Sequence, residues 1–447
     1  MPSPDRLKIA VVGTGISGLS AAWLLQARHD VTVYEKEGRI GGHSNTVSVA
    51  AGGVDIEVDT GFIVFNPLTY PNFVELLRVL GVESNDTDMS FAASLDGGRI
   101  EYSGNGLAGL FSQRSNLLRP RYWGMLADLV RFYARATRDA ERGLDEETTL
   151  GDYLAAGRYG AAFRDHHILP MASAIWSAPP AEILGYPAAA FLRFHANHGL
   201  LRLTGRPIWR TVAGGSRAYV ARLAEPLRGR IRVGAGAARI ERIAGRVVVT
   251  DGRGERDTFD RVVLATHADE ALALLADPDR KERALLGAFR YSRNEAWLHG
   301  DETFMPRRRA AWASWNYVAD SQAADRARVT YWMNTLQRLP TRANVFVTLN
   351  PDRPPRDTLR VESYDHPIFD AAAIGAQKAL WSLQGTGGVW YCGAHFGAGF
   401  HEDGLQAGLA VAEQLGHVRR PWRVANESSR IVVGAPPIPA PAREHAA

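Results

Sequence analysis

A glycine-rich turn between an apolar strand and a helix near the N-terminus restricts the fold of this chain more than any other feature. The apolar run Lys8–Val12 leads into Gly13, Gly15 and Gly18, and Leu19–Ala27 then carries helix-forming residues without a breaker. In such a turn the first glycine permits a sharp bend, the second lets backbone approach a ligand, and the third lets the helix pack closely on the strand. Free N–H groups at the start of the helix favour phosphate. The turn therefore predicts a βαβ unit that binds phosphate groups.

An acidic residue at the end of the next strand extends this prediction to a dinucleotide. The β-rich run Val31–Tyr34 ends at Glu35, about 20 residues after Gly15, which is the spacing at which an acid accepts hydrogen bonds from a ribose diol. A glycine turn alone is weak evidence, and an unrelated α/β protein is the alternative. Strand, glycines, helix and acid together predict dinucleotide binding.

Composition is that of an ordinary soluble globular protein. The 447 residues are 46% hydrophobic and 22% charged, which allows two or three domains and excludes a disordered chain. Lys and Arg number 52 against 48 Asp and Glu, and this near balance predicts no nucleic-acid partner. The one cysteine, Cys392, excludes an internal disulfide. The sequence contains no apolar run of about 18 residues, so no membrane span is expected. We expect a cytoplasmic protein, with peripheral membrane contact left open.

Glycine-rich segments farther along the chain indicate a family. The run Arg39–His43 has the pattern Arg-x-Gly-Gly-His, Asp59-Thr60-Gly61 follows it, and Tyr391–Ala394 and Glu402–Gly408 lie near the C-terminus. These segments resemble those of the flavin-containing amine oxidase and phytoene desaturase superfamily. The resemblance implies an α/β FAD-binding Rossmann-like domain of the amine-oxidase type with an inserted α+β substrate domain.

The resemblance also implies which residues hold the FAD. Cys392 precedes Gly393, the glycine expected at the pyrophosphate, so Cys392 is expected far from the flavin's 8α-methyl and the FAD is expected to be noncovalent. A helix expected from about Gly404 to Leu415 would present its N-terminus to the flavin and favour the negative charge of its reduced form. The expected cofactor-binding residues are Gly13, Gly15, Ile16, Ser17, Gly18, Glu35, Lys36, Arg39, Gly41, Gly42, His43, Gly61, Phe62, Ala237, Thr266, Gly393, Ala394, Glu402 and Asp403.

The order of strand and helix patterns predicts two discontinuous domains. Helical patterns dominate from about residue 105 to 200, after an amphipathic helix over Pro71–Leu80 that Gly81 should end. We expect an FAD-binding domain made of residues 1–75, 205–275 and 385–425, a substrate domain made of 76–204 and 276–384, and a C-terminal tail over 426–447.

Within the superfamily, several runs are similar to a bacterial branch of predicted NAD/FAD-binding proteins. These runs are Phe194–Leu201, Arg206–Arg217, Tyr331–Asn334 and Tyr364–Pro367. That branch is similar to the flavoprotein desaturase of furan fatty-acid synthesis and to the flavin domain of plant cyclopropane fatty-acid synthases. The resemblance suggests a lipid substrate.

One departure from the amine oxidases bears on the chemistry. Those enzymes usually keep a lysine near flavin N5, in a substrate-domain strand that corresponds here to Tyr291–His299, and this stretch contains no lysine. The departure counts against amine oxidation with O2.

Histidines and a few amides are the remaining candidates for chemistry. His198, His395 and His401 fall in segments that the resemblance places near the cavity or the flavin, where a histidine could shuttle protons. The candidates for substrate contact, which structural roles would explain equally well, are Trp209, Asn334, Gln337 and Tyr364. His195 and His198 lie three residues apart without a third ligand, so no metal is expected.

The stretch Leu107–Tyr133 mixes large apolar side chains with Arg114, Arg119, Arg121 and Arg131. It suits an interfacial helix or the mouth of an acyl tunnel, and a solvated face on a packed helix is the commoner alternative. The sequence thus favours an FAD-dependent oxidoreductase that takes hydride from a hydrophobic, fatty-acyl or lipid substrate onto flavin N5. An oxidase of an amine or small polar donor is the second hypothesis, and a non-catalytic flavin-binding partner of a lipid-modifying enzyme is the third.

Overall fold

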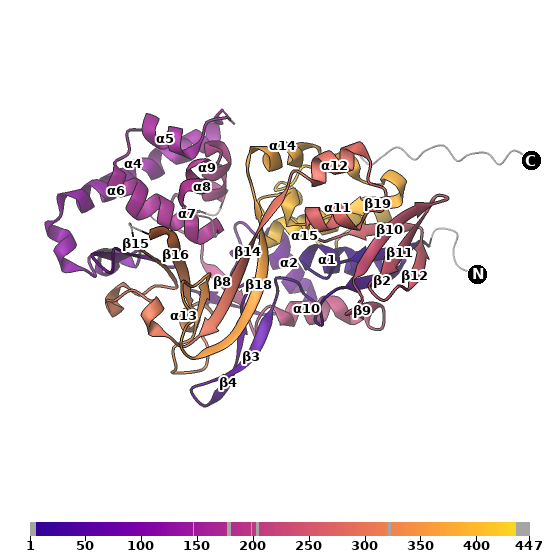
Figure 1. Ribbon diagram of the computed structural model, residues 1–447, viewed down its shortest axis with the longest axis horizontal. Helices are drawn as coiled ribbons and strands as arrows, with labels where there is room; N and C mark the ends of the chain where they lie inside the picture. Colours follow the sequence, from indigo (N-terminus) through magenta and orange to yellow (C-terminus); the bar gives the residue numbers. More distant parts are fainter. Residues whose placement is uncertain are drawn as a thin grey trace, which may run out of the picture. The chain divides into compact units, whose positions relative to one another are not determined.

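The computed structural model describes residues 6–145, 147–176, 180–197, 199–202, 205–320 and 323–434, and these form two compact units (Figure 1). Unit 1 contains Met1–Gly42, Val220–Arg290 and Ala372–Ala447. Unit 2 contains His43–Tyr219 and Tyr291–Ala371. Both units are therefore assembled from segments that lie far apart in the sequence.

Unit 1 is built on a five-stranded parallel sheet. Strand β1 (Lys8–Val12) lies at its centre, between β2 (Asp30–Glu35) and β13 (Arg261–Leu264), and β9 (Ile231–Val233) and β19 (Val389–Tyr391) form the edges. Residues 9–12 of β1 are fully or almost fully buried, because a central parallel strand is covered on both faces. This burial explains why β1 has a nearly continuous run of apolar residues.

Helix α1 (Ile16–Leu25) follows β1 through a turn that requires glycine. Gly13 has φ +101°, in the left-handed region, and its N–H donates to the Tyr34 carbonyl at 2.8 Å. A Cβ on Gly18 would lie 2.0 Å from the Gly13 carbonyl oxygen, so only glycine lets helix and strand pack this closely. The βαβ unit predicted from the sequence is confirmed.

The other elements of unit 1 surround this sheet. Helix α15 (His401–Gly416) is buried along most of its length and packs beside α1, and β10, β11 and β12 form a separate antiparallel sheet. The remaining bounds are β10 (Ala237–Ile243), β11 (Arg246–Asp251), β12 (Arg256–Phe259), α11 (Ala268–Leu274), α12 (Arg280–Leu286) and α14 (Ala371–Leu380). The boundary between the two units falls within α10 (Arg217–Ala224), after Tyr219.

Unit 2 contains a seven-stranded mixed sheet in the order β18-β14-β17-β16-β15-β6-β7. Two hydrogen-bonded pairs, β3 with β4 and β5 with β8, form two-stranded sheets beside it. The bounds are β3 (Thr46–Ala51), β4 (Val54–Asp59), β5 (Ser84–Thr87), β6 (Phe91–Leu95), β7 (Ile100–Ser103), β8 (Trp209–Val212), β14 (Arg290–His299), β15 (Trp315–Asp320), β16 (Ala323–Trp332), β17 (Phe346–Leu349) and β18 (Thr358–Ile368).

Helices α4 to α9 of unit 2 lie together in Figure 1, and α7 contacts β15. Tyr102, Phe132, Phe163 and Phe191 are fully or almost fully buried in the aromatic core around which they pack. The bounds are α2 (Pro71–Leu80), α3 (Gly106–Leu110), α4 (Pro120–Arg142), α5 (Leu150–Ala156), α6 (Ala161–Phe163), α7 (Leu169–Trp176), α8 (Pro180–Leu184), α9 (Ala188–Asn197) and α13 (Met333–Leu336). Within the described ranges, no helix combines the length and apolar character needed to cross a membrane.

The observed division differs from the expected domain boundaries. Residues 43–75 and 205–219, expected in the FAD-binding domain, lie in unit 2, where β8 pairs with β5. Residues 276–290 and 372–384, expected in the substrate domain, lie in unit 1. Of the expected C-terminal tail, residues 426–434 pack on α15, because Arg430 pairs with Asp403 at 2.5 Å and Gln414 donates to the Gly434 carbonyl. The rest of that tail lies outside the described residues.

Candidate functional site

The carboxyl ends of the five parallel strands of unit 1 meet at one edge of the sheet. The register aligns Val12 with Tyr34 and Leu264, Leu264 with Tyr391, and Glu35 with Val233. Ligands of open α/β sheets bind in the crevice at this edge. The segments that leave it are residues 13–18, 36–42, 234–237, 265–266 and 392–394, and they include most of the cofactor-binding residues expected in unit 1.

The start of α1 at this edge has the features of a diphosphate cradle. Gly15 is the N-cap and provides no side-chain cap, so the first N–H groups of the helix are left for a ligand. A Cβ built on Gly15 meets nothing within 4 Å, whereas one on Gly18 would collide with backbone. The open face at Gly15 and the uncapped helix end therefore fit the pyrophosphate of FAD.

Glu35 is buried at the end of β2 and holds two loops of the edge together. Its Oε2 accepts from the Thr14 N–H at 3.1 Å and from the Thr14 hydroxyl, and its Oε1 accepts from the Glu37 N–H at 2.8 Å. The Thr14 hydroxyl also accepts from the Gly41 N–H at 3.1 Å. Thr14 was not singled out in the sequence, although its place between Gly13 and Gly15 is the available signal. The carboxylate is thereby oriented in the position expected for a ribose acceptor.

Two basic residues that follow Glu35 have internal partners. The Arg39 guanidinium donates to the Gly42 carbonyl at 2.7 Å and so shapes its own loop. Lys36 pairs with Glu270 at 2.5 Å, and its side chain is 64% exposed. A Cβ on Gly42 would lie 3.1 Å from the Gly15 Cα, so the loop packs directly on the glycine turn.

His395 directly follows the strand-end segment 392–394 of unit 1. Its side chain is 4% exposed beside the Phe289 ring, with centroids 5.3 Å apart, and burial lowers its pKa to about 3. Its Nε2 is buried without a hydrogen-bond partner in the described part of the chain. A buried polar atom of this kind at the cofactor edge is consistent with a group that this chain binds there. His395 is therefore neutral, and it cannot act as a cationic acid near pH 7.

The remaining candidates of unit 1 lie on α15 or next to strands. Burial lowers the pKa of His401 to about 3 as well. Asp403 accepts from the Phe400 N–H at 2.8 Å and pairs with Arg430, so its carboxylate stabilises the start of the helix. Glu402 is fully buried and accepts from Gln406 at 3.0 Å.

The other cofactor-binding candidates occupy turns and strand starts. Ala237 begins β10, Thr266 and Ala394 are half-buried after β13 and β19, and a Cβ on Gly393 would lie 2.6 Å from the His395 ring. Ile16 and Ser17 are buried in the first turn of α1.

In unit 2 a polar cluster surrounds Tyr364, which is 5% exposed on β18. Its hydroxyl bonds with Thr60 Oγ1 at 2.7 Å and accepts from Asn45 Nδ2 at 3.0 Å. The His43 ring lies 5.0 Å from that of Tyr364 and 5.7 Å from that of His366. His43, predicted to bind the cofactor, and Tyr364, predicted to bind the substrate, thus lie together although they are far apart in the sequence.

Gly61 and Phe62, which directly follow Thr60 in the sequence, pack beside this cluster. A Cβ on Gly61 would lie 2.2 Å from the His43 carbonyl oxygen, so only glycine fits there. Phe62 packs edge-on against Phe73 at 5.3 Å.

A chain of amides determines the direction of the hydrogen bond to His366. Asn350 Oδ1 accepts from the backbone N–H of Glu295 at 2.8 Å, so Asn350 Nδ2 is the donor to Asn294 Oδ1 at 2.7 Å. Asn294 Nδ2 then donates to the Ser292 carbonyl at 3.0 Å and to His366 Nδ1 at 2.9 Å. Asn294 Nδ2 is therefore the donor, and His366 Nδ1 is the acceptor. This relay was missed in the sequence, because its members are far apart along the chain.

Two predicted substrate residues have their polar atoms bonded inside unit 2. Gln337 donates to Asp59 Oδ2 at 2.7 Å and accepts from the Asp59 N–H at 2.8 Å. Asn334 donates to the Ala343 carbonyl and accepts from the Val345 N–H, both at 2.8 Å. Both amides therefore hold loops of the unit in place.

The remaining predicted residues are Trp209 and His198. Trp209 is half-buried on β8, paired with Thr87 of β5. His198 lies outside the described residues. In the described ranges, no three His, Cys, Asp or Glu side chains gather as metal ligands would.

Asp59 is the most deeply buried acid of this network. It accepts from Ser216 N–H at 2.9 Å, Ser216 Oγ at 2.7 Å and Thr46 Oγ1 at 2.6 Å. Burial raises its pKa to about 6, although these donors oppose the shift. Asp59 joins β3, β4 and the Gly-Gly-Ser turn after β8, and the charge of Arg217 adds to these donors in favouring its charged form.

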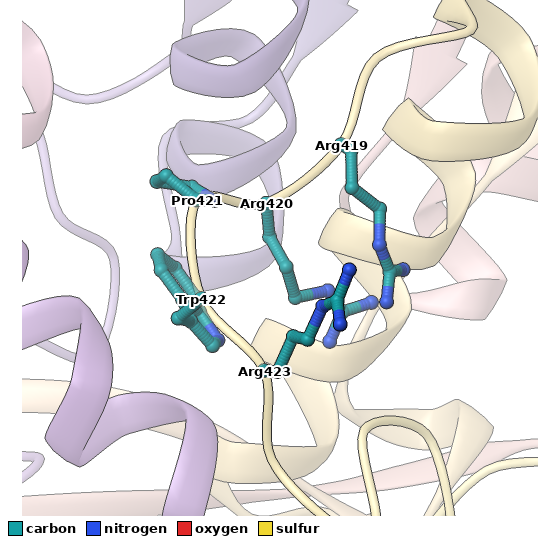
Figure 2. Close-up of a pocket in the computed structure, with 5 residues that line it drawn as sticks. All are labelled: Arg419, Arg420, Pro421, Trp422 and Arg423. Atoms are coloured by element: carbon teal, nitrogen blue, oxygen red, sulfur yellow. The ribbon is translucent and has the colours of Figure 1, made fainter.

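A surface cavity of about 310 Å³ lies in unit 1 beyond α15 (Figure 2). The guanidinium groups of Arg419, Arg420 and Arg423 turn toward one another there. Arg420 pairs with Glu413 at 2.8 Å, and Arg419 pairs with Glu413 at 2.9 Å and with Glu427. Most of this positive charge is thus compensated, and none of the predicted cofactor residues lines the cavity.

Comparison with known proteins agrees with the geometry of unit 1. Residues 16–309 match the model of the flavin containing amine oxidoreductase family. The chain belongs to this family. FAD is therefore its expected cofactor and FAD-dependent oxidation its class of chemistry, as the resemblance implied.

A curated relative and several solved structures are similar. AofH of Mycobacterium tuberculosis, named as a flavin-containing monoamine oxidase, is 28% identical over 292 residues, which cover 62% of this chain and 60% of AofH. The chain thus matches less than two thirds of that relative's length. A putrescine oxidase variant has a TM-score of 0.68 at 14% identity and covers 92% of this chain and 98% of its own. A fatty acid isomerase from P. acnes, described as CLA-producing, has a TM-score of 0.64 at 16% identity, with 93% and 99% covered. At these identities the structures establish the shared fold alone.

Proposed function

We propose that this protein is an FAD-dependent oxidoreductase that removes hydride from a hydrophobic, fatty-acyl or lipid substrate. The observation that carries the proposal is the neutral character of the inward-facing polar groups on β14 and β18. Asn294 occupies the strand in which the amine oxidases are expected to keep a lysine, and its amide donates to His366 Nδ1. Tyr364 adds a hydroxyl to the same cluster.

The acids of unit 2 that lie near these strands support the same choice. A cationic amine would favour an anionic binding site, because burial of an unpaired charge is costly. Asp59 accepts bonds from Ser216, Thr46 and Gln337, and Glu295 is exposed at the outward face of β14. With these acids bonded or exposed, a neutral substrate that carries one oxygen acceptor fits the polar groups of β14 and β18 better than an ammonium group does.

The residues of the chain would divide the work as follows. The uncapped start of α1, Gly15 and Glu35 would hold the FAD, and Arg39 would keep the neighbouring loop on the glycine turn. When bound, FAD supplies the acceptor for the hydride. The aromatic side chains of unit 2 would exclude water from the substrate.

Oxidation of an amine is the second candidate, and the similarity to AofH favours it. Under this alternative the family resemblance would extend to the substrate, and the absence of a lysine from β14 would not matter. The two candidates differ in the charge of the substrate, which makes them separable by experiment.

The test is reduction of the bound flavin without oxygen. The purified protein would be mixed anaerobically with fatty acids and fatty-acyl esters of increasing length, and separately with putrescine and cyclohexylamine, while the flavin absorbance is followed. We expect acyl compounds alone to bleach the flavin. We also expect binding to strengthen with chain length, since each buried methylene contributes about 0.8 kcal/mol. Bleaching by the amines, with peroxide formed in air, would overturn the proposal in favour of amine oxidation.

A further inference from the structure

The segment Leu107–Trp123 of unit 2 exposes large apolar side chains that a folded protein normally buries. Leu118 is 87% exposed and Leu107 75%, and Leu117 and Trp123 are each 48% exposed. Single exposed apolar residues are common, but a contiguous group of them marks an interaction surface.

These side chains belong to one surface. Phe111 lies one helical turn after Leu107, its ring is 5.4 Å from that of Trp123, and Trp123 Nε1 donates to the Leu117 carbonyl at 2.9 Å. Leu117 and Leu118 end the short 3-10 turn that precedes α4. We call Leu107, Leu117, Leu118 and Trp123, with the arginines described next, the basic-apolar patch.

The charged residues within this segment have one sign. Arg114, Arg119 and Arg121 lie in the segment, and the sequence has no Asp or Glu between Glu101 and Asp128. Arg119 donates to the Arg99 carbonyl and to Asn116, so it is held within unit 2. Arg114 and Arg121 are exposed, and in the described part of the chain neither forms an ion pair.

We propose that the basic-apolar patch docks the protein on an anionic lipid bilayer. Leu107, Leu117, Leu118 and Trp123 would enter the boundary between headgroups and acyl chains, and Arg114 and Arg121 would contact anionic headgroups. The inference rests on the proposed function for its biological meaning, because a protein that takes acyl substrates must meet them where they reside.

A bilayer fits these observations better than a protein partner does. A fluid interface accepts protruding leucines without a complementary surface, whereas a protein partner needs shape complementarity. The Trp123 indole can enter an apolar layer without losing a hydrogen bond, because Leu117 already accepts its Nε1–H. Exposed arginines that form no ion pair in the described ranges match the sign of an anionic leaflet.

The test is binding of the flavin-loaded protein to vesicles, measured by co-sedimentation without any substrate. We expect binding to phosphatidylcholine vesicles that contain phosphatidylglycerol, weaker binding to phosphatidylcholine alone, and a decrease with salt. Replacing both leucines (Leu117→Ser with Leu118→Ser) should weaken binding at least about tenfold, since two buried apolar side chains are lost. Replacing both free arginines (Arg114→Gln with Arg121→Gln) should weaken binding to the anionic vesicles about tenfold or more.

The controls use exposed residues of the same types elsewhere. Leu68 is 55% exposed and Arg228 is exposed, so Leu68→Ser and Arg228→Gln should bind vesicles as the unchanged protein does. All variants should keep their flavin, because the changed side chains are on the surface. Absence of vesicle binding, or equal loss in the controls, would overturn the proposal. A dimer that dissociates only in the patch variants, without vesicle binding, would instead assign the patch to a second copy. Each result leaves the proposed function to its own flavin-reduction test.

Discussion

The two units differ in how their predicted site residues use their polar atoms. In unit 1 the start of α1 has no side-chain cap, the Cβ position of Gly15 is open, and His395 Nε2 is buried without a partner in the described ranges. In unit 2 the amides of Gln337 and Asn334 are bonded to their own unit. Unit 1 therefore leaves groups that fit a ligand, whereas part of the predicted substrate site of unit 2 consists of structural amides.

The difference shows which kind of site local sequence can reveal. A dinucleotide needs backbone N–H groups and a close approach, and these are produced by glycines within a few residues of one another. A substrate pocket is assembled from side chains of distant segments. Local motifs therefore predict the cofactor site well and say little of the substrate.

The largest predicted effect concerns two buried histidines, one from each unit. Burial lowers the pKa of His395 to about 3 and that of His299 to about 4. Since these values lie below the unfolded value of about 6.5, the unfolded state takes up the protons first as pH falls. Stability should therefore be complete above about pH 6.5 and be lost toward pH 3, by about 1.4 kcal/mol per pH unit for each residue.

Single substitutions should separate the two histidines. His395→Leu should reduce the acid slope with little loss at pH 7, because its Nε2 has no partner to leave unpaired. His299→Leu should also cost about 1–3 kcal/mol at pH 7, since His299 bonds with Thr348 Oγ1 and the Asp301 N–H. Denaturant unfolding across pH measures both. Equal behaviour of the two variants would contradict the comparison.

The second effect tests the glycine turn of unit 1. Gly18→Ala places a Cβ 2.0 Å from the Gly13 carbonyl oxygen, and neither backbone segment can move without disturbing β1. We expect a loss of about 3 kcal/mol in the free energy of unfolding, or failure to fold. Gly38→Ala is the control, since its Cβ would meet nothing within 4 Å. Similar melting temperatures for both variants would show that the turn tolerates a side chain.

The sequence predicts features set by neighbouring residues better than features set by contacts between distant segments. The helix Pro71–Leu80 was predicted with its bounds, because Pro71 begins it and Gly81, at φ 65°, ends it. The helix expected from Gly404 begins instead at His401, where Asp403 supplies the cap. Glycine, proline and capping residues act locally, so their effects can be read from neighbouring positions.

The contacts that define unit 2 could not be predicted in this way. Gln337 bonds with Asp59 across 278 positions of sequence, and Asn350 bonds with Asn294 across 56. A single sequence contains no signal for such pairs, because any polar side chain could fill either position until the strands are paired.

The third effect tests whether Gln337 is structural. Gln337→Ala removes one donor from the buried Asp59 carboxylate and the acceptor of the Asp59 N–H. We expect a loss of about 1–3 kcal/mol in the free energy of unfolding, measured in denaturant, with flavin still bound to the folded protein. An unchanged unfolding free energy together with weaker substrate binding would return Gln337 to the substrate site.

The smallest predicted effect is also the most direct test of the cofactor site in unit 1. Gly15→Ala adds a methyl group where the protein itself has nothing within 4 Å, so the melting temperature of the flavin-free protein should not change. If the FAD diphosphate lies against Gly15, that methyl group occupies its place, and the affinity for FAD should fall at least about tenfold, a loss of roughly 1.4 kcal/mol. Titration of flavin-free Gly15→Ala with FAD, beside a Gly375→Ala control on α14 whose Cβ also meets nothing within 4 Å, measures this. Weaker FAD binding in Gly15→Ala alone is the predicted result, and equal FAD affinity in the two variants would contradict the placement of the cofactor at the start of α1.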